Sequence, residues 1–96
     1  MKQPIHWTSA GNTFRGSNGS EVVFEGRAGF RFRDHHGEYF VDGEMLMGNP
    51  AAVVMVDAIW RVRDGIRSPE SRKRRRQIAE QIRAAFASQG LVVEIV

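Results

Sequence analysis

The sequence has 96 residues, of which 42% are hydrophobic and 26% are charged, and its net charge at pH 7 is +3. These values are typical of one folded globular domain, and they argue against two domains or a disordered chain. The sequence contains no cysteine, which excludes a disulfide framework, a thiolate nucleophile and a cysteine-based zinc site.

The charges are unevenly distributed along the chain. Nine of the 14 basic residues fall within residues 61–83, against three acidic residues, whereas residues 1–60 hold five basic and seven acidic residues. Such a polarised field steers charged partners without identifying them. The start of the sequence, Met1–Pro4, lacks the apolar segment of a signal peptide, and the longest apolar run, residues 51–56, is much shorter than the about 20 residues needed to cross a bilayer. We therefore expect a cytoplasmic protein without a membrane partner.

The first half of the chain predicts an antiparallel meander. Residues 1–19 are weakly patterned, and Ile5, Trp7 and Phe14 are candidates there for short strands or loop anchors. From residue 20 onward, apolar and polar residues alternate with the period of a half-buried strand in three stretches: residues 20–24, 30–33 and 38–41. Short turns that contain glycine separate these stretches, which favours antiparallel neighbours.

The remaining strands flank a helix. Residues 51–56 are apolar on both faces, which predicts a strand near the middle of the sheet with the helix over one side. We expect residues 57–60 to end this strand as a turn or short helix, and residues 61–67 to form a polar connection. Residues 91–96 form the last predicted strand. The result is a single α+β domain over residues 1–96, with the element order ββββαβ.

The helix is predicted to run from Ser68 to Gln89. Ser68 is a good N-cap, Pro69 suits the first helical position, and Gly90 is a typical residue just after a helix. Glu70 would then meet the positive end of the helix dipole. Apolar residues recur at spacings of three and four along one face, at Ile78, Ile82, Ala85 and Phe86.

The first half of this helix carries five consecutive basic residues, from Arg72 to Arg76. Arg74 and Arg75 precede Ile78 by four and three residues, so they continue the apolar stripe and are partly structural. Arg72, Lys73 and Arg76 are expected to point outward. They either contact a partner, a protein in preference to nucleic acid, or form a solvated helix face.

The turn between the second and third stretches holds residues that bind metals in other proteins, namely Asp34, His35, His36 and Glu38. Adjacent residues in a tight turn rarely converge on one ion, so we predict a turn that hydrogen-bonds its own backbone and no metal site. Because its side chains project from a hairpin tip, this turn is a second candidate surface for a partner.

The candidates for catalytic residues are weaker than those for partner binding. Glu44 and Asp57 lie beside apolar runs and are the acids that could act in acid–base chemistry, but each is better explained as a cap, a turn residue or the partner of an arginine. Trp7 and Trp60 are expected in the core or at its edge. An exposed Trp60 beside arginine would be a third candidate for partner binding.

Residues 38–96 resemble a family of small bacterial immunity proteins from polymorphic and contact-dependent toxin systems. The resemblance runs through residues 39–46 (YFVDGEML), Ile59-Trp60, the arginine-rich helix and residues 90–96 (GLVVEIV). Within it, Glu44 and Trp60 match family positions, whereas the basic run from Lys73 to Arg76 is not part of the family pattern.

The resemblance implies a protein that binds a cognate toxin domain and blocks its activity, with no catalysis and no cofactor of its own. The alternative from the residues is a small nucleic-acid-binding regulator that uses the basic helix. An enzyme is the least favoured class, because no nucleophile, base and orienting group can be assembled. The sequence does not decide whether the partner contacts the helix, the hairpin tip or the surface around Trp60.

Overall fold

A computed structural model describes residues 4–24, 26 and 28–96 of the chain. Residues 1–3 lie outside the described residues, and so does most of the segment on which the expectation about a signal peptide was based. The helix α1 spans Arg72–Ala87. The strands are β1 (Trp7–Ala10), β2 (Thr13–Gly16), β3 (Glu21–Phe24), β4 (Ala28–Asp34), β5 (Gly37–Met45), β6 (Ala52–Arg63), β7 (Ile66–Pro69) and β8 (Val93–Ile95).

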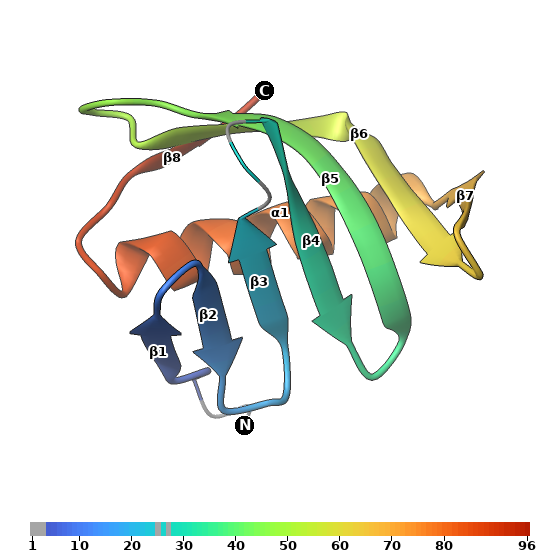
Figure 1. Cartoon of the computed structure of the whole chain (residues 1–96), viewed down its shortest axis with the longest axis horizontal. Helices are drawn as coiled ribbons and strands as arrows, with labels where there is room; N and C mark the ends of the chain where they lie inside the picture. Colours follow the sequence, from blue (N-terminus) through green and yellow to red (C-terminus); the bar gives the residue numbers. More distant parts are fainter. Residues whose placement is uncertain (1–3, 25, 27) are drawn as a thin grey trace.

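The described strands form one curled sheet in which neighbours along the chain pair antiparallel from β1 through β7. The last strand, β8, instead pairs parallel with the first half of β6. Figure 1 shows α1 crossing one side of the sheet, with the strands arched over it. The α+β class and the mostly antiparallel sheet are therefore as predicted. The predicted order ββββαβ is not confirmed, because the described chain has seven strands before the helix.

The strand β6 is bent by a large bulge. Its pairing with β5 jumps from Val54 opposite Gly43 to Ile59 opposite Val41, so four residues of β6 face one residue of β5. Bulges of this kind bend a strand and sharpen its twist. The bend divides one edge of β6 between two partners, because its first half pairs with β8 and its second half pairs with β7.

The core lies between α1 and the inner face of the sheet. The predicted stripe is fully buried, since Ile78, Ile82, Ala85 and Phe86 are each 0% exposed. The ring of Phe86 lies 5.1 Å from Phe14 and 6.0 Å from Phe30, between centroids. An amphipathic helix is held mainly by such packing rather than by its own propensity.

Residues 1–19 contain more regular structure than their sequence pattern predicts. β1 and β2 form a hairpin around Gly11 and Asn12, with Trp7 and Phe14 buried in the core. Single apolar anchors are enough here because each strand is four residues long and only one or two side chains face inward. Trp7 is a core residue, as expected.

The segment between β6 and α1 also differs from the prediction. Residues 57–60 do not end a strand, and residues 61–67 are not a plain connection, because β6 and β7 form a hairpin around Asp64 and Gly65. Both hairpin residues have positive φ, at 53° and 77°, which suits a tight turn between antiparallel strands.

The predicted start of the helix is wrong. Ser68 and Pro69 belong to β7, and the N-cap is Ser71, whose hydroxyl oxygen accepts a hydrogen bond from the Arg74 N–H at 3.2 Å. Two equally good capping serines lie three residues apart, and pairing of Pro69 with Trp60 in the sheet decides between them. Gly90 has φ 74° and follows the last turn, as predicted.

No helix in the described part of the chain is both long and apolar enough to span a membrane.

Candidate partner-binding groove

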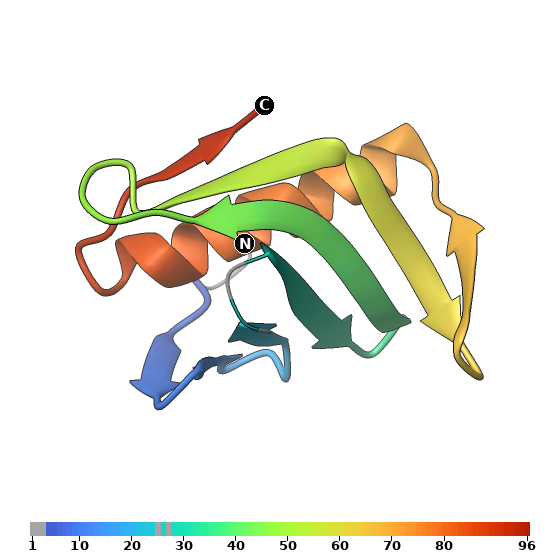
Figure 2. The same cartoon turned by 45° about the horizontal axis from the view of Figure 1, so that its top comes forward.

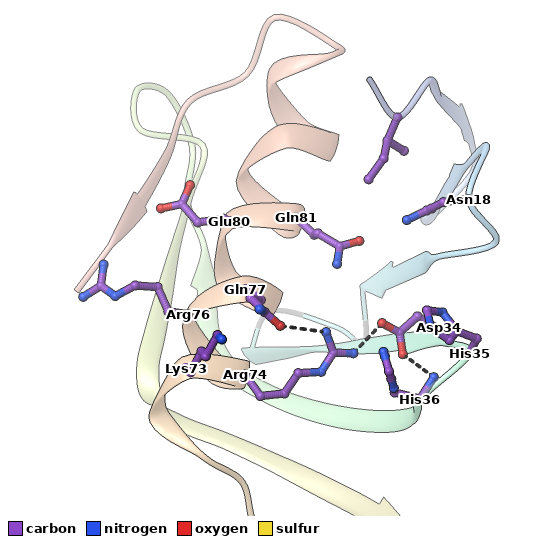
Figure 3. Close-up of a pocket in the computed structure, with 11 residues that line it drawn as sticks. Asn18, Asp34, His35, His36, Lys73, Arg74, Arg76, Gln77, Glu80 and Gln81 are labelled. Atoms are coloured by element: carbon purple, nitrogen blue, oxygen red, sulfur yellow. Dashed lines mark hydrogen bonds and ion pairs between the residues drawn. The ribbon is translucent and has the colours of Figure 1, made fainter. Parts of the chain in front are cut away.

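A groove lies between the first half of α1 and the tip of the β4–β5 hairpin (Figure 3). Its volume is about 910 Å³. The lining residues come from the N-terminal segment, the hairpin tip and the helix: Ile5, Asn18, Asp34, His35, His36, Lys73, Arg74, Arg76, Gln77, Glu80 and Gln81. Two surfaces that the sequence treats as separate candidates therefore meet in one depression.

An ion pair between Arg74 and Asp34 joins the two sides of the groove. The guanidinium of Arg74 points from the helix to one carboxylate oxygen of Asp34, as Figure 3 shows. The other carboxylate oxygen accepts a hydrogen bond from the His36 N–H at 2.9 Å. Arg74 also donates to the hydroxyl of Tyr39 at 3.4 Å and lies over the ring of that residue. The Asp34 side chain is only 4% exposed.

These contacts change the protonation equilibria of both partners. Burial alone would raise the pKa of the Asp34 carboxyl, but the hydrogen bonds from Arg74 and from the His36 N–H, with the nearby positive charge, lower that pKa below its usual value. For Arg74, burial opposes the charge, yet the hydrogen bonds to Tyr39 and Asp34 raise its pKa. Both side chains are therefore held in their charged forms.

The predicted hydrogen bond within this turn is confirmed, since the Asp34 carboxylate accepts from the backbone N–H of His36. The rings of His35 and His36 lie 4.0 Å apart between centroids, at the tip of the hairpin. Within the described residues, no three histidine, aspartate or glutamate side chains are placed to hold one metal ion.

The helix supplies the rim of the groove. Lys73 and Arg76 are exposed, and neither forms an ion pair within the described residues. In Figure 3, Arg76 and Glu80 extend from the helix toward the side away from the hairpin. Glu80 is engaged by Arg83, whose guanidinium donates to its carboxylate at 2.6 Å. Lys73 and Arg76 are thus the cations of the rim that are free to meet a partner.

The position of these bases opposes helix stability. The first turn of α1 contains no acidic residue and begins with three basic ones, although the positive end of the helix dipole favours acids there. Glu70 was expected to fill that role, but it precedes the N-cap, where its carboxylate accepts a hydrogen bond from the Ser71 N–H at 2.8 Å. Residues that break a local rule of stability are expected at functional sites.

The remaining wall of the groove is fixed by amide side chains. The buried Ser20 donates its hydroxyl proton to Gln81 at 2.9 Å, and its N–H donates to the side-chain oxygen of Asn18 at 3.0 Å. The turn before β3 is thereby tied to the middle of α1. Anchored side chains at several points make the groove a preformed surface.

The other predicted partner-binding residues lie outside the groove. Arg72 is exposed but is not part of the lining. Glu38 forms an ion pair with Arg31 at 3.5 Å and lines a separate depression beside Phe40. Trp60 is 36% exposed and lies opposite Phe40 in the register of β5 and β6. The structure therefore brings together five predicted residues, Asp34, His35, His36, Lys73 and Arg76, and separates three.

Several groove residues were not predicted, among them Asn18, Gln77 and Gln81. The two glutamines could have been predicted from helical spacing, because Lys73, Gln77 and Gln81 follow one another at intervals of four residues and so lie on one helix face. Nothing in the sequence pairs Asn18 with them. As for the two acids weighed for catalysis, Glu44 is exposed and Asp57 pairs with Arg75 at 3.6 Å.

No family model matches the sequence, and neither a curated protein nor a solved structure matches it.

Proposed function

We propose that this protein is an immunity protein, a non-catalytic inhibitor that binds a cognate toxin domain in the cytoplasm and neutralises it. The observation that carries the proposal is the groove, which gathers five of the eight residues named for partner binding between two elements joined by the Arg74–Asp34 ion pair. The resemblance of residues 38–96 to immunity proteins supplies the class of partner.

The chemistry of the groove favours a segment of a protein over nucleic acid. The free cations Lys73 and Arg76 share the lining with the carboxylates of Asp34 and Glu80 and with three side-chain amides. Mixed charges and amides suit the backbone and side chains of a polypeptide, whereas a phosphate chain would find only two unpaired cations in the described lining, Lys73 and Arg76. A volume of about 910 Å³ accommodates a few side chains of such a segment.

The direct test uses the product of the gene immediately upstream, which the proposal predicts to be the cognate toxin domain. We expect a 1:1 complex by native mass spectrometry and protection of cells that express both proteins. The double variant Lys73→Glu/Arg76→Glu should abolish protection and slow association by at least about tenfold, since charges at an interface mainly set the association rate.

A matched control variant distinguishes the effect of the groove residues from the effect of a change in net charge. Arg63→Glu/Arg72→Glu changes the charge by the same amount at two exposed residues outside the groove, so it should leave protection intact. The groove variant should remain folded, because an acid at residue 73 improves the match to the helix dipole. Loss of protection by both variants would reject the groove as the interface. Failure of the wild-type protein to protect would reject the immunity function itself.

A further inference from the structure

Most of the large exposed apolar side chains in the described chain belong to segments that lie outside the groove lining. Six of the eight large exposed hydrophobic residues in the described chain belong to the β5–β6 connection, the first half of β6 or the segment around β8: Leu46, Met47, Met55, Leu91, Val92 and Val96. Met47 is 99% exposed and Val96 is 57% exposed. Large exposed apolar side chains on paired or adjoining segments are typical of interaction sites.

These segments include an open strand edge. Within the described residues, β8 pairs only with β6, and Figure 2 shows it at the margin of the sheet. The Val92 carbonyl accepts a hydrogen bond from the N–H of Ala51, just before β6, and the Val96 N–H donates to the Val54 carbonyl in β6. Because backbone groups alternate in direction along a strand, Val93 and Ile95 direct their N–H and C=O groups to the open side. Those groups can bind an added strand.

The open edge lacks the usual devices against pairing. Natural edge strands carry proline, lysine or inward-pointing charge, and β7, the edge beyond the second half of β6, contains Arg67 and Pro69. The segment from Leu91 to Val96 contains neither proline nor a basic residue, and Glu94 is its single charge. Its edge therefore remains able to pair.

The charges beside this edge select the occupant. Glu44, Val53 and Glu94 lie directly opposite one another on β5, β6 and β8, so the two carboxylates share one face of the sheet with Val53 between them. Both glutamates are exposed, and neither forms an ion pair within the described residues. An added strand that places lysine or arginine on this face would complement them.

We propose that β8 accepts an extended strand of a partner polypeptide in which basic and apolar side chains alternate. Its basic side chains lie on the outer face beside Glu94, and its apolar side chains face the same side as Val93 and Ile95. A second copy fits this edge less well, because the antiparallel register that overlaps all of residues 92–96 places Glu94 against its own copy. This mode of recognition is strand addition to a sheet edge.

The probe for the test is a short capped peptide in which valine alternates with lysine. It should bind the protein, slow hydrogen exchange of the Val93 and Ile95 amides, and lose affinity as salt is added. The same peptide with glutamate in place of lysine should not bind. Glu44→Gln/Glu94→Gln should weaken binding about three- to tenfold, whereas Ile66→Lys, on the β6–β7 hairpin, should leave it unchanged.

Methylated peptides make the edge geometry testable without altering the protein. If the peptide adds antiparallel to β8, methylation of the valine amides blocks the bonds to Val93 and Ile95 and should abolish binding, whereas methylation of the lysine amides should leave binding intact. A parallel strand would reverse these two results. Equal binding of both methylated peptides would overturn strand addition. So would absence of binding by the unmodified peptide, or a dimer of the free protein in which the Val93 and Ile95 amides are already protected from exchange.

Discussion

Phe86 is the residue through which α1 is most firmly packed on the sheet. It is fully buried, and its ring meets Phe14, Phe24 and Phe30, which come from β2, β3 and β4. Phe86→Ala removes contacts with three strands at once and should lower the free energy of unfolding by about 3–5 kcal/mol, as measured by urea denaturation. Gln89→Ala, an exposed change after the helix, is the control. An unchanged denaturation midpoint for Phe86→Ala would mean that this face of the helix does not pack against the sheet.

The Asp34–Arg74 ion pair gives a second prediction at the scale of single residues. Asp34→Asn should cost about 1.5–3 kcal/mol of stability at neutral pH, because it weakens hydrogen bonds to a charged group. The pKa of Asp34 is lowered in the folded state, so its stabilisation is complete above the usual carboxyl pKa of about 3.9 and is lost as the pH falls through the lower, folded value.

The difference in unfolding free energy between the wild type and Asp34→Asn should therefore be constant from about pH 7 to about pH 5 and shrink toward pH 2. Other carboxyl groups titrate in both proteins and cancel in the difference. Denaturation at a series of pH values measures it. A difference that stays constant down to pH 2 would show that Asp34 does not depend on its charge for the contact with Arg74.

The environment of a residue could be predicted from the sequence where its neighbours along the helix define it. The burial of Ile78 and Ile82 and the partial burial of Arg74 and Arg75 follow from helical spacing alone, and all four are confirmed. The partner of Arg74 does not follow from spacing, because Asp34 is 40 residues away in the chain. The meeting of the hairpin tip with the helix therefore required the tertiary structure.

At the scale of elements, the start of α1 tests how neighbouring strands limit a helix. Ser71→Ala should cost about 1 kcal/mol, since the Ser71 hydroxyl oxygen accepts a hydrogen bond from the Arg74 N–H. Ser68→Ala is a matched control three residues earlier, and it should change stability by less than about 0.5 kcal/mol because Ser68 is exposed in β7. The reverse order, with Ser68 the more sensitive site in thermal unfolding, would support the longer helix expected from sequence.

Short edge elements were the part of the fold that the pattern did not reveal. β7 is exposed at all four residues, so it has no apolar periodicity to detect. β1 has a single buried side chain, that of Trp7. Periodicity reports burial on one face, and strands that bury almost nothing leave almost no period. The bulge in β6 hides a long strand for a related reason, because it interrupts the alternation between Val54 and Ile59.

At the scale of the whole molecule, most of the described arginines outside the rim of the groove are already paired with acids. Arg15 and Arg33 both contact Glu21, Arg61 contacts Glu70, and Arg75 contacts Asp57. Exposed pairs of this kind contribute little to stability. They do neutralise much of the positive potential over the sheet, so the basic composition overstates the charge available to a polyanion.

This pairing predicts how the protein behaves toward nucleic acid. If the free bases Arg72, Lys73 and Arg76 met phosphates, only about three counterions would be released, which supports weak binding that falls further as salt increases. We expect no micromolar binding to duplex or single-stranded oligonucleotides at about 150 mM salt, as measured by fluorescence anisotropy. Micromolar binding that disappears in Arg72→Glu/Lys73→Glu/Arg76→Glu and persists in Arg15→Glu/Arg33→Glu would identify the helix as a nucleic-acid surface. A nucleic-acid-binding regulator that uses the basic helix would then replace the toxin inhibitor as the proposed function of the protein.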